Sequence, residues 1–531
     1  MMKTQLLIKH LFEYATTYFP NQTIVARHPE GIHRATYQEY ADRVRRLATA
    51  LSELGVKTGD RVGTFLWNDH EHFESYFAIP CMGGVLHTIN IRLGSEQMAY
   101  IINHAEDRVL IVDRTLWPLL APIYDRLTAV KAIILTGPRT QDDPPGTYDY
   151  EALIEKAEPM PSFPDLDEES PMGMCYTSGT TGNPKGVVYS HRGMYLHSLT
   201  LGLANTMGLS MIDSVLPVVP MFHVNAWGLP FAALWFGAKI VLPGPAPQPS
   251  ILLELLKDEE ITVAAGVPTV WLGLLREMES KPADLKLRFA ICGGSAAPES
   301  LIRQWETTYN IPFLHAYGMT ETGPIASSAR LKTHHQDLPY NEQLKIKSTQ
   351  GMLVPGLTIR LDRNGSDVPW DGVQFGEMCI QGPWIADEYY NDDRSRSTFI
   401  DGWLHTGDVA AIDPEGYIHI VDRTKDVIKS GGEWISSVDL ENALMSHPGV
   451  YEAAVVGVPH PKWDERPLAF VVPKAEQIIS KEELMALLAQ KFPKWQLPDD
   501  ILFIDEVPKT SVGKFLKRSL RTQYKDYLVE K

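Results

Sequence analysis

Helix and strand patterns alternate along the first part of the chain. Thr36 and Glu39 match a capping box, and apolar residues follow at helical spacing up to a stop at Gly55. Residues 62–66 read as a short apolar strand, and Ser95 is expected to cap another helix. Strands that alternate with helices pair mainly in parallel and are covered on both faces. The pattern therefore predicts an α/β fold with helix-covered sheets.

The pattern changes after Gly402. Short strands are expected at residues 411–412 and 417–421, and the polar run 422–426 precedes a compact α+β pattern. A chain of 531 residues is also longer than one core usually supports. We therefore predict two domains, residues 1–423 and 424–531, with the boundary between Arg423 and Thr424.

Composition excludes several classes of protein. The 49 Lys plus Arg against 66 Asp plus Glu give a net charge of -17, which disfavours nucleic acid and anionic lipid as partners. Four scattered cysteines without a CxxC pair argue against a disulfide framework or a zinc site and favour a reducing cytoplasm. Pro230, Gly237 and Lys239 interrupt the most apolar stretch, residues 226–245, so no integral membrane segment is predicted. We expect a cytoplasmic protein without a signal peptide.

The most informative motif is the glycine-rich run YTSGTTGNPKG at residues 176–186, between two predicted strands. Glycines expose backbone N–H groups, while hydroxyls and Lys185 add donors and positive charge. This combination favours a polyphosphate ligand. The run is not a Walker A loop, because Pro184 precedes Lys185 and no Ser or Thr follows it. The structural alternative is a surface loop with coincidental hydroxyls.

Two further motifs follow predicted strands. Residues 317–321, YGMTE, place an aromatic ring beside a hydroxyl and the Glu321 carboxylate, the type of ligand that Mg²⁺ takes together with phosphates. The small residues at 293–297 allow a flat ring to approach the backbone, although a tight connection with Pro298 at a helix start explains them equally.

Charged residues near the C-terminus complete the series. Asp408 lies in a Gly-Asp turn, which is usually structural, although a single buried carboxylate there can accept both ribose hydroxyls. Lys509 and Lys514 flank a small turn, where an ammonium group can offset charge at a phosphate. Lys509 is interpreted as a solvated surface charge, and contact with a ligand phosphate is the alternative.

In this order, the motifs resemble those of the adenylate-forming superfamily, which includes acyl-CoA synthetases, peptide-synthetase adenylation domains and firefly-type luciferases. The resemblance extends over essentially the whole chain. It implies a large N-terminal domain of mixed sheets with a β-barrel-like part and a small mobile α+β C-terminal domain. It also implies an enzyme that uses ATP and Mg²⁺ to join a small-molecule carboxylic acid to coenzyme A through an acyl-adenylate, with a homodimer as a possible assembly.

The resemblance assigns roles residue by residue. It makes Lys514, Thr320 and His223 catalytic residues and makes Thr177 and Glu321 the ligands of Mg²⁺. It makes Lys425 the hinge of a domain rotation. This rotation withdraws Lys514 from the active site and brings in the loop of Gly431, Gly432 and Trp434. Nucleotide and coenzyme A contacts fall on Thr177, Ser178, Gly179, Thr180, Thr181, Gly182, Lys185, Gly294, Ser295, Ala296, His315, Ala316, Tyr317, Gly318, Met319, Asp408, Arg423, Lys425, Gly431, Gly432 and Trp434. For His315 a purely structural role is an equal alternative.

The acid is expected to be apolar. The acyl pocket implied by the resemblance consists of His223, Asn225, Trp227, Val267, Trp271 and Gly293. His223 replaces the aspartate that amino-acid-activating relatives carry, and residues 218–227 and 429–437 look like those of bacterial medium- and long-chain fatty-acid CoA ligases. His223 and Trp271 could instead be core residues. Aryl or short thioether acids, or transfer to a carrier protein, stay open as alternatives.

Overall fold

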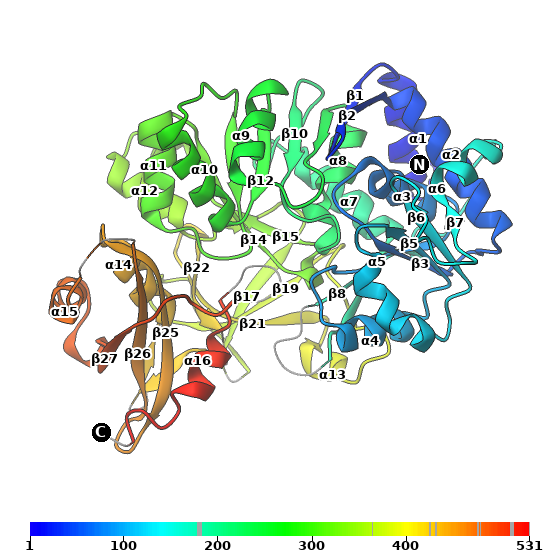
Figure 1. Ribbon diagram of the computed structural model, residues 1–531. Helices are drawn as coiled ribbons and strands as arrows, with labels where there is room; N and C mark the ends of the chain where they lie inside the picture. Colours follow the sequence, from blue (N-terminus) through cyan, green and yellow to red (C-terminus); the bar gives the residue numbers. More distant parts are fainter. Residues whose placement is uncertain are drawn as a thin grey trace.

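The computed structural model describes residues 1–177, 183–363, 365–423, 426–430, 433–474, 477, 479–509 and 515–529, without the side chains of Glu433 and Trp434. Two large sheets and their helices form the N-terminal part, a smaller antiparallel sheet follows, and the C-terminal part lies beside it at the lower left of Figure 1. The mixed α/β architecture predicted from the sequence is confirmed.

The first large sheet has seven strands in the order β7-β6-β5-β3-β4-β8-β9, parallel except for the β8–β9 pair. Its strands are β3 (Arg61–Phe65), β4 (Val85–Thr88), β5 (Val109–Asp113), β6 (Ala132–Thr136), β7 (Tyr148–Asp149), β8 (Pro171–Tyr176) and β9 (Gly186–Ser190). The hairpin of β8 and β9 carries the glycine-rich loop at its end.

The second large sheet has nine strands in the order β16-β15-β14-β13-β12-β10-β11-β1-β2. Its strands are β1 (Thr23–His28), β2 (Gly31–Thr36), β10 (Ser214–Pro217), β11 (Lys239–Leu242), β12 (Val263–Gly266), β13 (Phe289–Cys292), β14 (Phe313–Gly318), β15 (Ile325–Ser328) and β16 (Met352–Leu353). The six central strands are parallel, whereas β2, β15 and β16 are antiparallel to their neighbours.

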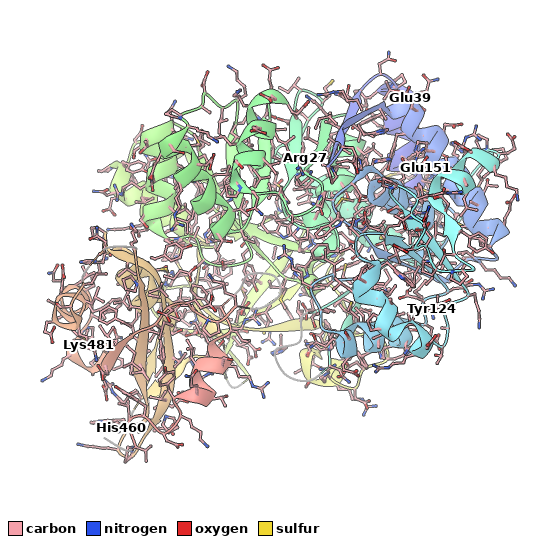
Figure 2. The ribbon with its side chains drawn as sticks, viewed as in Figure 1. Arg27, Glu39, Tyr124, Glu151, His460 and Lys481 are labelled. Atoms are coloured by element: carbon pink, nitrogen blue, oxygen red, sulfur yellow. The ribbon has the colours of Figure 1, made fainter. Side chains whose placement is uncertain are left out.

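Helices separate and cover the two sheets. Between them lie α1 (Ile8–Tyr18), α2 (Tyr37–Glu53), α3 (His70–Cys81), α7 (His191–Leu201) and α8 (Leu229–Trp235), with α6 (Tyr150–Lys156) at the edge. The outer face of the seven-stranded sheet packs on α4 (Ser95–Ala105) and α5 (Trp117–Leu120). The outer face of the nine-stranded sheet packs on α9 (Pro249–Asp258), α10 (Pro268–Ser280), α11 (Glu299–Tyr309) and α12 (Tyr340–Ser348). Figure 2 shows side chains filling the spaces between these layers.

Strand alternation explains these layers. Ile24 and Ala26 of β1 enter the core between the sheets, whereas Val25 enters the outer core. Both faces of the central strands are therefore apolar, as parallel strands require. The predicted capping box is present at the start of α2, where Thr36 and Glu39 bond reciprocally. Ser95 does not cap α4: it is the first helical residue, and Gly94 occupies the cap position without a side-chain bond.

A six-stranded antiparallel sheet forms the barrel-like part that the resemblance implies. It contains β17 (Thr358–Arg363), β18 (Ser366–Asp367), β19 (Gly376–Gln381), β20 (Phe399–Ile400), β21 (Trp403–Ile412) and β22 (Ile418–Arg423), with the short α13 (Ser395–Thr398) before β20. Figure 1 shows this sheet between the helical layers and the C-terminal part. Ile418 at the start of β22 forms a bridge with Gly351, next to the edge strand β16 of the nine-stranded sheet.

The C-terminal part has its own five-stranded sheet, made of β23 (Ile428–Ser430), β24 (Glu433–Ile435), β25 (Val450–His460), β26 (Asp464–Pro473) and β27 (Asp500–Phe503). Helices α14 (Ser437–Met445), α15 (Lys481–Ala489) and α16 (Lys517–Gln523) pack on it. His460 marks the far end of the β25–β26 hairpin in Figure 2. No helix in the described part of the chain is long and apolar enough to cross a membrane.

Candidate active site

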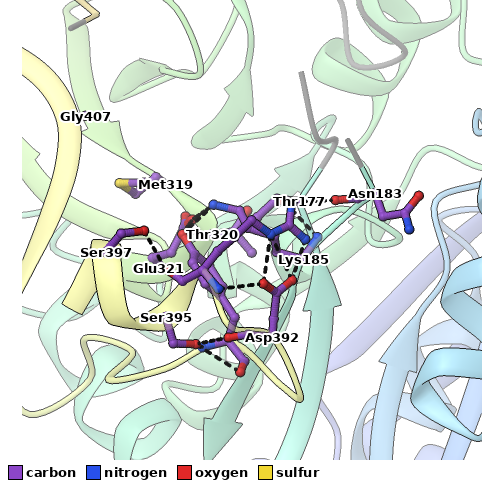
Figure 3. Close-up of polar contacts among 12 residues, drawn as sticks. Thr177, Asn183, Lys185, Met319, Thr320, Glu321, Asp392, Ser395, Ser397 and Gly407 are labelled. Atoms are coloured by element: carbon purple, nitrogen blue, oxygen red, sulfur yellow. Dashed lines mark hydrogen bonds and ion pairs between the residues drawn. The ribbon is translucent and has the colours of Figure 1, made fainter. Parts of the chain in front are cut away.

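A chain of polar contacts links the glycine-rich hairpin to the motif at residues 317–321. Lys185 Nζ donates to Tyr389 Oη at 2.7 Å, and Tyr389 Oη donates to Glu321 Oε1 at 2.6 Å. Lys185 Nζ also lies 3.8 Å from Glu321 Oε1 and 3.9 Å from the centre of the Tyr389 ring. Three segments distant in sequence therefore hold one cation against one carboxylate, and Figure 3 labels the two charged groups, Lys185 and Glu321.

The electrostatics of this cluster follow from its burial. Burial lowers the pKa of the Lys185 ammonium, although the Glu321 charge opposes the shift. Burial and the Glu321 charge raise the pKa of Tyr389, so its hydroxyl keeps its proton and donates it. Glu321 itself is only 4% exposed. A buried carboxylate with one cation nearby is suited to a ligand that brings further charge.

Backbone contacts fix the same cluster. Thr177 N donates to Lys185 O at 2.9 Å, closing the base of the loop, and Lys185 N donates to Thr177 Oγ1 at 3.3 Å. Tyr189 Oη donates to Thr320 O at 2.8 Å, which ties β9 to the short turn that carries Thr320. The predicted contacts Thr177, Lys185, Thr320 and Glu321 thus lie together. Ser178, Gly179, Thr180, Thr181 and Gly182, predicted from the same loop, lie outside the described residues.

A second polar group stands at the end of β14. Tyr317 Oη donates to Asp408 Oδ2 at 2.6 Å, and Arg423 Nε lies 3.0 Å from Asp408 Oδ1. Asp408 and Arg423 are paired residues of β21 and β22, so the antiparallel register itself places the guanidinium beside the carboxylate. The Asp408 charge raises the pKa of Arg423. Asp408 is 3% exposed, whereas 45% of the Arg423 side chain is open to solvent.

Close backbone packing explains the glycine of this motif. A Cβ built on Gly318 would lie 2.0 Å from Pro324 O, so no other residue fits there without moving the chain. Met319 N donates to Thr322 Oγ1 at 2.9 Å, which closes the turn toward Glu321. The geometry brings the aromatic, hydroxyl and carboxylate groups of the motif together at the carboxyl end of β14.

Small residues at 293–294 face Trp227. A Cβ on Gly293 would lie 2.9 Å from Ala316 O and 3.1 Å from Trp227 Cη2. A Cβ on Gly294, whose φ is +82°, would lie 3.2 Å from Val267 Cγ1. Trp227, Val267, Gly293, Gly294 and Ala316 therefore adjoin one another. Ser295 and Ala296 continue this loop, which ends before α11.

The segment that carries His223 has an unusual backbone. Val224, Asn225, Ala226 and Trp227 all have positive φ, from 46° to 60°. A left-handed conformation costs roughly 1–2 kcal/mol for each L-residue, so such runs persist only where the surroundings hold them. Asn225 is buried, and Cys175 Sγ donates to its Oδ1 at 3.5 Å. This turn places Trp227 against residues 293–294.

Two predicted residues have structural partners. Trp271 is fully buried, and its indole N–H lies 3.1 Å from Gly266 O and 3.0 Å from Ile291 O. It packs edge-on against Trp305, in the core position given above as the alternative to a place in the acyl pocket. His315 is also buried, and its Nδ1 lies 2.7 Å from Thr349 O. Burial lowers the pKa of His315, so its ring is neutral and anchored to the main chain.

Several predicted residues cannot be placed. Lys425, Gly431, Gly432 and Lys514 lie outside the described residues, as does the side chain of Trp434. Lys509, in contrast, forms an ion pair with Glu452 at 2.6 Å. Because the Glu452 carboxylate is buried, this pair gives Lys509 a structural partner in β25.

Three contributors to the site were missed by sequence reasoning. Tyr389 bridges Lys185 and Glu321, Tyr189 holds Thr320, and Arg394 Nη1 donates to Asn183 O at 3.0 Å. Asp392 accepts hydrogen bonds from Nε and Nη2 of Arg394 and fixes the direction of its guanidinium. These residues belong to none of the local motifs, because each acts across a long sequence separation. Of the three, only Arg394 has a local signal, the charged turn at residues 392–394.

A separate cavity of about 560 Å³ is lined among others by Tyr189, His197, Gly323, Trp384 and Tyr390. It includes none of the residues predicted to bind the acid. The acyl pocket expected from the sequence is therefore distinct from this cavity.

Comparisons with known proteins agree with this arrangement. The profile of the family described as AMP-binding enzyme matches residues 12–390, and that of the AMP-binding enzyme C-terminal domain matches residues 439–514. A long-chain-fatty-acid–CoA ligase of Thermus thermophilus is 50% identical over 99% of this chain and 97% of its own. A 3-methylmercaptopropionyl-CoA ligase of Ruegeria lacuscaerulensis is 44% identical over 99% of each chain.

A solved structure extends the likeness to three dimensions. The anthranilate CoA ligase AuaEII in complex with anthranoyl-AMP superposes with a TM-score of 0.89 over 99% of each chain, at 27% identity. Family profiles, near full-length relatives and the fold agree. This chain belongs to the AMP-binding enzyme family and is an acyl-CoA synthetase of the adenylate-forming superfamily.

Proposed function

We propose that this protein is an ATP-dependent, AMP-forming ligase that converts a medium- or long-chain fatty acid to its acyl-CoA through an acyl-adenylate. The proposal rests on the position of Tyr317, Asp408 and Arg423 beside the Lys185–Glu321 cluster at the carboxyl end of β14. An aromatic face, a buried carboxylate and two cations are the groups that an adenine, a ribose and a triphosphate require.

The proposed roles follow from these positions. Tyr317 would stack on adenine, with residues 294–296 packing against its other face. Asp408 would accept the ribose hydroxyls while Arg423 balances its charge. Lys185 and the hydroxyls of the glycine-rich loop would bind the phosphates.

The donors at residues 177 and 321 are a hydroxyl and a carboxylate, which are oxygen ligands that suit Mg²⁺. Glu321 and Thr177 would hold this ion, which neutralises phosphate charge when bound. Lys185, now 3.8 Å from Glu321, would then be available to the phosphates.

The reaction would proceed in two steps. The acid carboxylate attacks the α-phosphate and pyrophosphate leaves, with Lys514 stabilising the charge on the phosphate. The coenzyme A thiolate then attacks the acyl carbonyl and AMP leaves. We propose that residues 424–531 form a domain that turns about Lys425 between the steps, exchanging Lys514 for the loop of Gly431, Gly432 and Trp434.

Two observations support a fatty acid as the substrate. Trp227, Val267 and Gly293 form a largely apolar wall, which suits a neutral alkyl chain. The similar Thermus protein is named a long-chain-fatty-acid ligase. The similar Ruegeria protein is named for a short thioether acid, so that acid is the second candidate.

A pyrophosphate-release assay with straight-chain acids from acetate to stearate, and with 3-methylmercaptopropionate, tests the proposal. We expect the highest kcat/KM for a medium or long chain, together with thioester formation when coenzyme A is present. Preference for the thioether acid would support the second candidate. Pyrophosphate release without thioester would instead favour transfer to a carrier protein, and no release with any acid would refute the activity.

A further inference from the structure

A group of histidines lies far along the chain from the proposed nucleotide site. His28 ends β1, His33 lies in β2, and His70 and Glu71 open α3. One ligand atom each of His28, His70 and Glu71 lies within 4.8 Å of the others. His33 stacks on His70 with ring centres 4.2 Å apart. The group thus joins a hairpin of the nine-stranded sheet to a helix that follows the seven-stranded sheet.

The contacts within this group leave an acceptor unsatisfied. His70 Nδ1 lies 3.0 Å from His28 Nε2 and 3.0 Å from Glu71 Oε2. One proton on Nδ1 can be donated to only one of these two atoms. Glu71 Oε2 is buried and accepts no hydrogen bond from the part of the chain that the structure describes. Two ring nitrogens and one carboxylate oxygen therefore converge, and a single cation would contact all three.

The surroundings favour such a cation. His28 Nε2 faces His70 Nδ1, so both ring nitrogens are directed into the same space as the Glu71 carboxylate. The nearest competing cation is engaged elsewhere, because Arg43 pairs with Glu74 at 2.6 Å and with Glu151 at 2.7 Å. Two imidazole nitrogens and one carboxylate oxygen form a ligand set that suits Zn²⁺.

We propose that His28, His70 and Glu71 form a zinc site that fastens the β1–β2 hairpin to the first turn of α3. Water or a reoriented His33 supplies the fourth ligand of a tetrahedral ion. The scattered cysteines argue only against a thiolate site, and this one uses none. It goes beyond the proposed ligase activity and does not depend on it.

A second histidine group serves as an internal comparison. His334, His335 and Glu415 also offer ligand atoms within 4.8 Å of one another. In this group, the Nε2 atoms of His334 and His335 lie 2.9 and 3.1 Å from Glu415 Oε2. Lys332 Nζ lies 3.4 Å from the same oxygen. The lysine already supplies positive charge, so this group does not need a metal.

The site has a structural connection to the acyl pocket. Asn68, two residues before His70, accepts a hydrogen bond from Met221 N at 2.7 Å and donates to Pro217 O and Val219 O, each at 3.0 Å. These bonds hold the segment that leads to His223. Zinc at the start of α3 would therefore stabilise the region that supports the pocket.

The proposal is tested by zinc titration. Tag-free protein is treated with a chelator, desalted and then titrated with ZnCl2. Wild type and His334→Gln should each retain one equivalent of zinc by elemental analysis, even with excess Mg²⁺, which prefers oxygen ligands. His28→Gln should bind zinc at least about tenfold more weakly, and His28→Gln/His70→Gln should retain none. The melting temperature of wild type should rise with zinc, and that of the double variant should not.

Failure of wild type to retain zinc, or retention of a full equivalent by His28→Gln with unchanged affinity, would overturn the proposal. Circular dichroism checks the fold of each variant. If the double variant fails to fold, His28→Gln decides, since its side chain lies at a half-buried strand end. Cobalt in place of zinc gives a further readout: tetrahedral nitrogen and oxygen ligation produces visible absorption in wild type, and its absence would contradict the assigned ligands.

Discussion

Tyr317 donates its phenolic hydrogen to Asp408 across 2.6 Å and thereby joins β14 of the nine-stranded sheet to β21 of the antiparallel sheet. The bond orients the ring that would face adenine and the carboxylate that would face ribose. Arg423 lies on the other carboxylate oxygen. The two halves of the proposed nucleoside site are thus coupled before any ligand binds.

Replacement of Asp408 by Asn should weaken ATP binding. The substitution removes the charge beside Arg423 and one strong acceptor for the ribose hydroxyls. Because hydrogen bonds to charged groups contribute about 1.5–3 kcal/mol, kcat/KM for ATP should fall by about 10- to 100-fold. Steady-state kinetics with ATP as the varied substrate measures the effect. Tyr317→Phe, which keeps the ring, should lose less. An unchanged KM for ATP in Asp408→Asn would contradict the ribose role.

Glu321→Gln should raise the Mg²⁺ concentration that half-saturates the reaction. The substitution keeps the shape and the acceptor for Tyr389 but removes the charge that a divalent ion requires. Initial rates at fixed ATP over a Mg²⁺ series measure this. Glu377→Gln, a change at a half-buried carboxylate of β19, is the control and should leave the Mg²⁺ dependence unchanged. Identical Mg²⁺ curves for wild type and Glu321→Gln would show that another group binds the ion.

Lys514→Ala should impair adenylation by about 100- to 1,000-fold, the usual effect of removing one group that stabilises developing charge. Thioester formation from preformed acyl-adenylate should change far less. Single-turnover assays separate the two half-reactions. Lys509→Ala is the matched control, because Lys509 is paired with Glu452 at 2.6 Å and should contribute little to either step. Equal loss in both half-reactions of Lys514→Ala would argue against the moving domain.

Acid should destabilise the protein through buried histidines. Burial lowers the pKa of His197 from 6.5 to about 3, and its Nε2 accepts a hydrogen bond from Ile325 N at 3.1 Å. Below pH 6.5 the unfolded chain protonates this histidine, whereas in the folded chain it stays neutral. The contribution of His197 to the free energy of unfolding is therefore present above pH 6.5 and is lost as pH falls from 6.5 toward 3. The contribution is about 1.4 kcal/mol for each pH unit in that window.

Denaturant unfolding at several pH values measures this slope. His197→Gln, whose amide oxygen can accept the same bond, should be less stable at neutral pH but should lose less stability on acidification. Above about pH 7.5 the slopes of the two proteins should coincide, because histidine is neutral in both states there. Equal slopes below pH 6.5 would mean that His197 does not titrate on unfolding.

Local patterns predicted much of this fold. The capping box of Thr36 and Glu39 marks the start of α2, and the strands that flank the glycine-rich loop form where their apolar runs predict them. Ser95 shows the limit of such reasoning. A serine before an apolar helix resembles a cap, but the chain begins the helix one residue earlier and leaves the hydroxyl without that role.

The sequence by itself determined the alternation of helices and strands and the order of the motifs, because both depend on short-range patterns of apolar, polar and small residues. Tertiary structure alone decided that Tyr389 bridges Lys185 and Glu321, that Trp271 belongs to a core, and that His28 meets His70. These contacts join residues far apart in the chain. Their geometry arises from how the two large sheets and the antiparallel sheet pack, which no local pattern encodes.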